Sequence, residues 1–446
     1  MKSTASLRQF GALALAVALA VALTTATFSI AADTLQHPGD LTVHEWGTFT
    51  SVAGEDGSAI DWDVLGGKDD LPGFVNDQGY RCVKSRLGGT VRMETPVIYF
   101  YSPREITASV KVQFPHGVIT EWYPKGDNAI YESKSLMDQM SAATKSHMYS
   151  DGDVYPTKSL IDPAPLGLGP ALVRLSPSLN GIDMSLRHLM GAIAWNDIKI
   201  QPGSTADFPD ERRPSRYYAA RGTDAAPITA GDQHEKFLFY RGVGRFPVPL
   251  SVRLSADRRV VVENRGPDPV PTAILFENRG GRLGYRNAGA IETAGAIQSV
   301  VTLDAPSLDG SFSQLRRDLE TALVAQGLFP KEAQAMVETW RDSWFEEGSR
   351  LIYIVPGHAI DAMLTLQVDP APSQTARVFV GRIELMTAET RRSVEEAFAR
   401  GDWPVIERYG RFLDPILERI SSESPWKAAQ VEEFRRKIPF SVVACR

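Results

Sequence analysis

Three stretches of the chain alternate between apolar and polar residues. In the first, Val110, Val112 and Phe114 are separated by polar side chains, and residues 250–254 and 364–368 show the same period of two. This period is typical of a β-strand with one buried and one solvated face. Each stretch therefore predicts a strand that covers a core on one side only.

A short run of apolar and aromatic residues precedes each alternating stretch. These runs lie at residues 97–101, 236–241 and 351–355, and they predict strands covered on both faces. Returning strands follow at residues 118–123, 273–276 and 378–385. Two interpretations fit this order, an internal repeat or three meanders that share only strand chemistry, and the unequal spacings favour the second. Each meander has an apolar face that it must bury against the others or against helices.

Turn and capping residues predict the remaining elements. Pro115 fixes φ and Gly117 accepts a positive φ, so the segment between them predicts the hairpin turn of the first meander. Other strands are predicted at residues 41–51 and 195–200, and helices at 184–190, 314–326, 330–347, 387–400, 403–420 with a break at Asp414-Pro415, and 424–437. The fold class predicted is α+β, mostly β: a β-sandwich-like body of stacked antiparallel meanders with inserted and C-terminal helices.

The order of elements divides the chain into six predicted regions. They are a signal peptide (1–31), an N-terminal β region (32–124), an irregular insertion (125–234), a second β region (235–310), a helical pair with the third meander (311–386) and C-terminal helices (387–446). The insertion shows no sustained period. It is either a long decorated loop system or a region where the pattern does not reveal the elements.

The first 31 residues have the features of a secretory signal peptide. Lys2 and Arg8 precede an apolar run from Gly11 to Leu23, and Ser29-Ile30-Ala31 supplies the small residues that a signal peptidase requires. The apolar run is short for a membrane span, so we expect cleavage after Ala31, with a retained anchor as the alternative. The mature protein is then soluble and periplasmic or secreted, with no membrane span.

The net charge limits the classes of binding partner, and the cysteines indicate one possible crosslink. A net charge of −6 over 446 residues argues against nucleic acid or anionic membranes, and the oligomeric state stays open. Cys82 and Cys445 form a disulfide candidate, because disulfides persist in exported proteins. Such a bond would contribute about 4 kcal/mol in the chain-entropy model. Two free thiols fit equally well, since sequence does not show whether the two Cα atoms approach each other.

Five segments carry a resemblance to known proteins. They are VHEWGTFTS, METPVIYFY, ITEWYP, KFLFYRG and TWRDSWFEEGSRLIYIVP. Together they resemble a family of exported bacterial proteins, over the chain from about Leu41 to Leu385. The resemblance implies export and a single architecture. The family has no assigned activity, so the resemblance implies no reaction.

Candidate chemistry begins with the triplet His44-Glu45-Trp46. A histidine oriented by a carboxylate can bind a metal or move a proton. Neighbouring residues of a strand face opposite ways, however, so His44 and Glu45 would not share a site, and a structural role is the simpler interpretation. The chain contains no HExxH, HxH or CxxC motif, and the sequence predicts no metal and no cofactor.

Two further glutamates, Glu94 and Glu121, lie on the first predicted meander. Carboxylates that face one cleft at roughly 5–10 Å can divide acid, base and nucleophile roles, as glycoside hydrolysis requires. The alternative is that both face water, as strand glutamates usually do. If Glu121 lies on the inward face, it must be paired or functional. Arg241 follows the same logic, with a cross-strand salt bridge as its simplest role.

Tryptophans suggest a different function. Exposed rings offer flat faces to sugars and other ligands, and Trp46 and Trp122 are the candidates. Trp340 and Trp344 instead have the helical spacing of core residues. The chain has no GxSxG, no P-loop and no strand-linked GxGxxG motif, which disfavours the common serine hydrolases, nucleotide hydrolases and dinucleotide-dependent enzymes.

Two hypotheses of different class follow. The first is an exported module that binds carbohydrate or another extracellular polymer, or has a structural role. Its binding residues are His44, Trp46, Trp122 and Arg241. The second is a secreted hydrolase or lyase with three acid–base candidates, Glu45, Glu94 and Glu121. The first is favoured, because the sequence shows no catalytic constellation.

Overall fold

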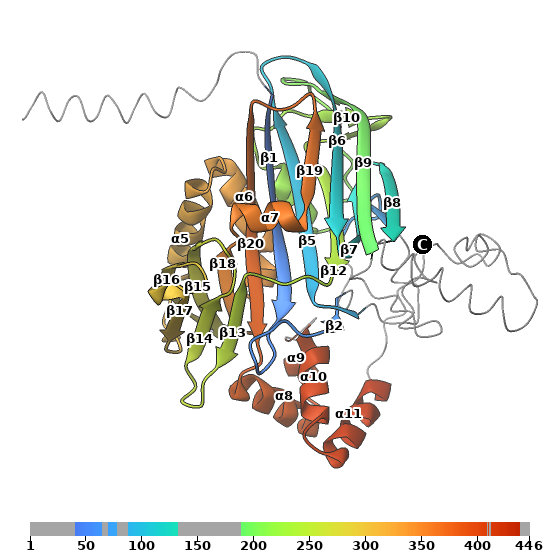
Figure 1. Cartoon of the computed structure of the whole chain (residues 1–446). Helices are drawn as coiled ribbons and strands as arrows, with labels where there is room; N and C mark the ends of the chain where they lie inside the picture. The colour runs from blue at the N-terminus through green and yellow to red at the C-terminus, as the bar shows by residue number, and fades with distance from the viewer. Residues whose placement is uncertain are drawn as a thin grey trace, which may run out of the picture.

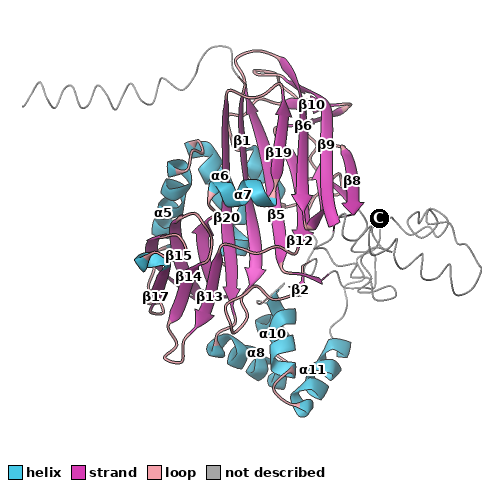
Figure 2. Ribbon diagram, viewed as in Figure 1, coloured by secondary structure: helices cyan, strands magenta, loops and turns pink. Residues whose placement is uncertain are grey.

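The computed structural model describes residues 41–64, 70–77, 88–132, 189–407, 409 and 412–437. The predicted signal peptide, both cysteines and residues 184–188 of a predicted helix lie outside these ranges. Over the described chain, strands form one large mixed sheet and two small ones, with helices on one face and at one end (Figure 1, Figure 2). The predicted class, mostly β with inserted and C-terminal helices, is confirmed.

The first layer is a row of strands built around β1, the strand Thr42–Val52. In order across the sheet the strands are β7 (Gly117–Tyr123), β12 (Leu238–Gly244), β5 (Val91–Tyr101), β1, β20 (Gln374–Leu385), β18 (Gly348–Ile354), β15 (Val270–Arg279) and β16 (Arg282–Ile291). β1 is antiparallel to β5 and parallel to β20. Every residue of β12 and β18 is buried, so these runs are covered on both faces, as predicted.

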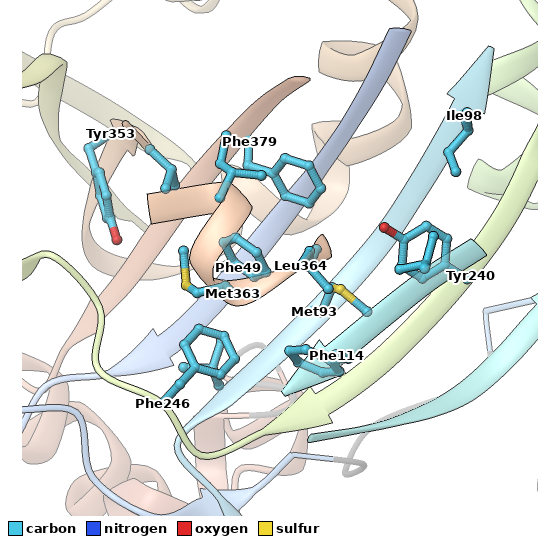
Figure 3. Packing of buried hydrophobic residues seen from close by; sticks show 14 of the residues in the cluster. Phe49, Met93, Ile98, Phe114, Tyr240, Phe246, Tyr353, Met363, Leu364 and Phe379 are labelled. Atoms are coloured by element: carbon cyan, nitrogen blue, oxygen red, sulfur yellow. The ribbon is translucent and has the colours of Figure 1, made fainter. Parts of the chain in front are cut away.

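The second layer covers one face of this row. It contains β6 (Ile106–Pro115), β8 (Asp127–Glu132), β9 (Leu189–Ile200), β10 (Ile228–Ala230), β11 (Gln233–Glu235) and β19 (Thr365–Asp369). A small sheet of β13 (Leu250–Leu254), β14 (Val260–Asn264) and β17 (Val300–Leu303) lies on the same side, with the short helix α7 (Gly357–Met363). Figure 3 shows the shared core, in which Phe49 and Phe379 of the first layer stack at 4.9 Å and Phe114 comes from the second.

The predicted strands exist, but their predicted pairing is wrong. β5, β6 and β7 form no meander, because β7 pairs with β12 in the first layer and β6 pairs with β9 and β19 in the second. The residue with positive φ at the connection is His116, not Gly117. Gly117 is needed for a different reason, since a Cβ there would lie 2.7 Å from the carbonyl oxygen of Val243. Periodicity predicted the strands that are buried on both faces, but not the neighbours of each strand. The alternation predicted for residues 250–254 is not observed, since Leu254 is exposed.

Helices cover the opposite face of the first layer. α5 (Phe312–Ala325), α6 (Pro330–Trp344) and the short 3-10 helix η4 (Arg216–Arg221) pack there around Trp46, Trp340 and Trp344. α6 starts at Pro330 as predicted and ends three residues earlier than predicted. In the predicted helix 184–190, Leu189 and Met190 belong to β9 instead.

The C-terminal helices lie at one end of both layers (Figure 1). They are α8 (Ala388–Arg400), α9 (Trp403–Glu407), α10 (Leu413–Ser421) and α11 (Pro425–Lys437). The helix is interrupted between α9 and α10, but the break lies before Leu413 and not at Asp414-Pro415 as predicted. Pro415 lies in the first turn of α10, where an N–H has no helical partner to lose. None of the described helices is long and apolar enough to span a bilayer. The remaining short elements are β2 (Trp62–Asp63), β3 (Asn76–Asp77), β4 (Gly88–Gly89) and η5 (Ile297–Ser299).

Candidate functional site

The triplet His44-Glu45-Trp46 lies in the N-terminal half of β1, and its side chains point to opposite faces of the sheet. His44 and Trp46 face the helices, where the rings of Trp46 and Tyr99 lie 6.1 Å apart. Glu45 faces the second layer, where Tyr240 donates a hydrogen bond to it. Strand geometry therefore separates His44 from Glu45, and the three residues form no common site.

A carboxylate does orient His44, but it is Glu332 of α6. Nδ1 of His44 lies 2.8 Å from Oε2 of Glu332, and the Tyr101 hydroxyl donates to Oε1 at 2.8 Å. Glu332 also accepts the backbone N–H of the N-cap residue Phe329 at 2.7 Å, from the third position of α6. Burial and the nearby Glu332 charge raise the pKa of Tyr101. Glu332 thus joins the start of α6 to β1 and β5.

Both carboxylate oxygens of Glu45 are bonded inside the core between the layers. Tyr240 donates to Oε1, and Nε of Arg377 donates to Oε2 at 2.6 Å. Arg377 also donates to Asp361 at 2.6 Å and to the carbonyl of Leu364 at 2.8 Å. Burial, with the Glu45 charge, raises the pKa of Tyr240. Glu45 therefore links α7 to the sheet through Arg377 of β20. It lies on the face opposite to the other two predicted glutamates.

Glu94 and Glu121 do come together, around a single guanidinium. Arg241 of β12 lies opposite Glu121 of β7 in the sheet register. Burial lowers the pKa of Arg241, but the charges of Asp70, Glu121 and Glu94 outweigh it and raise that pKa. Glu94, Glu121 and Arg241 are exposed by only 1%, 6% and 3%. Glu121 thus lies on an inward face, so its charge is a buried one that needs compensation.

Asp70, which the sequence did not single out, completes this group. Its two carboxylate oxygens accept Nη1 and Nη2 of Arg241 at 2.8 and 3.0 Å, and Arg216 of η4 lies 3.5 Å away. Burial acts to raise the pKa of Asp70, but the charges of Arg241, Arg92 and Arg216 hold it well below its usual value. Asp70 follows a polar loop without periodicity, so no sequence signal marked it.

Further buried charges continue across the same face toward β18. Nε of Arg350 donates to Glu384 at 2.8 Å, and Arg382 donates to Ser343 of α6 at 2.8 Å. Burial raises the pKa of Glu384 despite these arginines. We call the whole set the charged band: Asp70, Arg92, Glu94, Glu121, Arg241, Arg350, Arg382 and Glu384. It crosses the first layer beneath η4 and α6, and its charges alternate in sign.

The predicted aromatic faces are not exposed. Trp46 is fully buried under the helices, and Trp122 is 9% exposed in the core between the layers. Trp340 and Trp344 are core residues, as predicted. In the described part of the chain, the exposed tryptophan is Trp426 on α11, at 67%. Burial thus contradicts the expectation that Trp46 or Trp122 presents a face to a sugar.

Two open pockets lie away from the charged band, on the side of the second layer. The proline-rimmed pocket has a volume of about 880 Å³ and is bordered by Pro115, Pro247, Pro249 and Pro267. The arginine-rimmed pocket has a volume of about 730 Å³ and lies between the small sheet, the first layer and the C-terminal helices. No three His, Cys, Asp or Glu side chains of the described residues are grouped to hold a metal ion.

Comparison with known proteins adds no function to this geometry. No family model and no curated protein matches the chain. Among solved structures it is distantly similar to the Fcho1 mu homology domain of Danio rerio with bound Eps15 peptide, at 8% identity over 78% of this chain and 97% of that one, with a TM-score of 0.27. The yeast delta-COP-I mu-homology domain complexed with a Dsl1 WxWxV peptide gives 8% identity, 79% and 100% coverage and a TM-score of 0.25. Likeness at this level supports no functional inference.

Proposed function

We propose that the protein is an exported binding module whose proline-rimmed pocket takes an apolar ligand with one anionic group. Arg245 carries this proposal. Its side chain lines the pocket beside an apolar floor that includes Phe246, Leu250 and Met363, and its buried Nε has no hydrogen-bond acceptor among the described residues. A ligand carboxylate supplies the acceptor that this N–H lacks, in a charge-assisted hydrogen bond.

A second unpartnered group lies next to Arg245. The backbone N–H of Thr90 donates to the carbonyl of Gly244 at 3.1 Å, which brings Thr90 beside Arg245, and the buried Thr90 hydroxyl has no partner. The Arg245 side chain is held in place by Asp61, 2.5 Å from Nη2. Unsatisfied buried polar groups cost about 1–3 kcal/mol each. Two of them at one pocket wall support a ligand that bonds both.

The pocket walls support a small apolar ligand over a polymer of sugars. Proline fixes φ, so the four prolines of the rim give walls that need little ordering when a ligand binds. A volume of about 880 Å³ is in the range of pockets for drug-sized ligands. Phe246, the aromatic residue of the floor, is only 6% exposed, so it offers no face for sugar stacking. An alkyl or acyl chain fits this lining.

Export is part of the proposal, and it rests on the basic and apolar N-terminus and on the resemblance to exported bacterial proteins. N-terminal sequencing of the protein recovered from the periplasm or the medium is expected to start at Ala32. A chain that keeps Met1, found only inside the cell, would contradict export without affecting the pocket.

Binding is tested by titrating the purified protein with dodecanoate, dodecanol and dodecylammonium in a calorimeter. Dodecanoate should bind at least about 10-fold more tightly than dodecanol. The reason is that the free energy of one charge-assisted hydrogen bond corresponds to a change in affinity of about this size. Arg245→Gln should remove this advantage and leave dodecanol binding unchanged. Arg282→Gln, at an exposed site on β16, is the matched control. Equal affinities for the three compounds, or no binding of any, would refute the proposal.

A hydrolase or lyase is the second candidate, and the observation in its favour is the approach of Glu94 and Glu121 to Arg241. Glu45 takes no part in such a pair, because it faces the second layer. The test is hydrolysis of a panel of nitrophenyl glycosides by the wild type, Glu94→Gln and Glu121→Gln. Activity lost in both variants supports the enzyme. Activity kept in both, or none in the wild type, argues against it.

A further inference from the structure

The arginine-rimmed pocket lies where three parts of the molecule meet. It is lined by the small sheet, by residues of β15, β18 and β20, and by the start of α8 with Arg419 of α10. Figure 1 shows β13, β14 and α8 near one another at the lower end of the molecule. Its rim holds five arginines and three glutamates: Arg253, Arg258, Arg279, Arg391, Arg419, Glu55, Glu277 and Glu389. The rim is therefore cationic in an acidic protein.

Each of the three glutamates is already paired with an arginine of the rim. Glu389 lies 3.1 Å from Arg258, Glu277 pairs with Arg279, and Glu55 pairs with Arg419. None of these carboxylates is left to neutralise the other two arginines of the rim.

Of those two arginines, Arg253 gives the pocket its excess positive charge, because Arg391 and Lys427 are balanced by Glu423 and Glu395. Arg391 reaches out of the pocket to Glu423, which it shares with Lys427 at 2.7 Å. Arg253 is exposed on β13, and the described residues offer it no ion pair. An anionic ligand matches this surplus.

The floor of the pocket is apolar. Val252, Val260, Leu275 and Leu385 line it, and Leu254 is 37% exposed at β13. A bound molecule thus places an apolar part on the floor and its charges at the rim. Guanidinium groups present parallel N–H donors that match the oxygens of phosphate. We propose that the arginine-rimmed pocket binds a phosphate monoester with an apolar substituent, and that this ligand fastens the C-terminal helices to the β layers.

The ion pairs of the rim show which segments such a ligand would fasten together. Arg258, in the turn between β13 and β14, meets Glu389 of α8, and Arg419 of α10 meets Glu55 in the turn after β1. These pairs are largely exposed, and exposed pairs contribute only about 0–1 kcal/mol each. A dianion held by arginines from both sides adds a connection between them. A ligand that binds only the docked helices must stabilise the docking.

This site is separate from the proline-rimmed pocket and does not depend on the function proposed for it. The turn after β1 lies between the two: Gly54 lines the arginine-rimmed pocket and Gly57 the proline-rimmed one. The amide of Val252 donates to the carbonyl of Gly57 at 3.1 Å, which fixes that turn on β13. A ligand in one pocket therefore need not compete with a ligand in the other.

The experiment is a calorimetric titration of the full-length protein with octyl phosphate, beside inorganic phosphate, octanol and octanedioate. Octyl phosphate should bind at least about 10-fold more tightly than each of the other three, and Arg253→Gln should weaken it by about 10-fold. Arg282→Gln is expected to leave it unchanged, and the titrations are made in the Arg245→Gln background, in which the proline-rimmed pocket has lost the group that favours an anion. Affinity should rise between pH 5.5 and 7.5, because the second phosphate proton leaves near pH 6 while arginine does not titrate.

Hydrogen exchange gives the independent readout of fastening. Amides of α8 and α10 should exchange more slowly with octyl phosphate bound, and this protection should be lost in Arg253→Gln. Octanedioate binding as tightly as octyl phosphate, or an affinity unaffected by Arg253→Gln, would overturn the site. Binding without slower exchange would overturn the fastening. Melting temperatures of the variants are measured first, and Arg253→Lys, which keeps the charge but not the parallel donors, should retain only part of the affinity.

Discussion

Arg241 is the residue on which the charged band most depends. It is 3% exposed, binds Asp70 through two hydrogen bonds and lies near the charges of Glu94 and Glu121. Replacing it with methionine leaves buried carboxylates uncompensated, so Arg241→Met should lower the free energy of unfolding by about 3–5 kcal/mol. Urea denaturation measures the change. Arg282→Met on the exposed face of β16 should stay within about 0.5 kcal/mol, and equal losses at the two positions would contradict a stabilising role for Arg241.

Asp70 gives the same group a pH dependence. Its pKa in the folded protein lies below the unfolded value, so the unfolded chain takes up the proton first as the pH falls. The stability that ionised Asp70 contributes is therefore present at neutral pH and is lost below about pH 4. The difference in unfolding free energy between the wild type and Asp70→Asn should be constant from pH 8 to about 5 and shrink toward pH 3. Denaturation at a series of pH values tests this, and an undiminished difference at pH 3 would rule it out.

β1 also presents buried hydroxyls to the helices without satisfying them. Thr48 and Thr50 pair with Glu94 and Arg92 in the sheet register and are at most 1% exposed, and neither hydroxyl has a hydrogen-bond partner within the described ranges. Valine has a similar shape without the hydroxyl, and an unsatisfied buried hydroxyl costs about 1–3 kcal/mol. Thr48→Val should therefore raise the free energy of unfolding by about 1 kcal/mol, measured by urea denaturation.

Thr120 of β7 is the matched comparison for Thr48. It is equally buried, but its hydroxyl donates to Glu121, so Thr120→Val should lose about 1–2 kcal/mol. If Thr48→Val is destabilised as much as Thr120→Val, the hydroxyl of Thr48 has a partner in solution, and a water or ligand reaches the face between β1 and α6.

Local patterns in the sequence predicted the secondary-structure elements and the strands that are buried on both faces, because both depend on residues that are close in the chain. The runs at residues 236–241 and 351–355 became fully buried strands, and the alternating stretch at 106–115 became an outer one. The burial of Trp46 and Trp122 could not be predicted from these patterns. A first-layer strand is buried on both faces. The alternation of its side chains therefore does not distinguish a solvated face from a buried one.

The candidate site was harder to predict because its contacts join distant parts of the chain. Glu94, Glu121 and Arg241 were recognised as candidates, but Asp70 is 171 residues from Arg241 and Glu332 is 288 residues from His44. Such pairs depend on which strands and helices become neighbours. Local periodicity carries no information on that choice, and the pairing predicted from chain order was the part that failed.

At the scale of the whole molecule, the first strand of the described chain pairs with the last one. β1 pairs with β20 from Thr42 and Gln374 to Val52 and Glu384, and Arg377 reaches Glu45 across 332 residues. Long loops are costly to close before the contacts that reward closure exist, so folds rich in distant pairs fold slowly. We expect the β1–β20 pairing to form after the local hairpin of β13 and β14.

Two fully buried valines distinguish these steps. Val380 of β20 lies beside Thr48 of β1, whereas Val262 of β14 pairs with Val252 in the local hairpin. Truncation of either valine to alanine should lower the free energy of unfolding by about 2 kcal/mol. If β20 docks late, Val380→Ala speeds unfolding and leaves refolding unchanged, while Val262→Ala slows refolding. Stopped-flow tryptophan fluorescence in urea measures both rates. Slower refolding of Val380→Ala than of Val262→Ala would mean that the most distant strand pair forms first, and that the local hairpin is added to it afterwards.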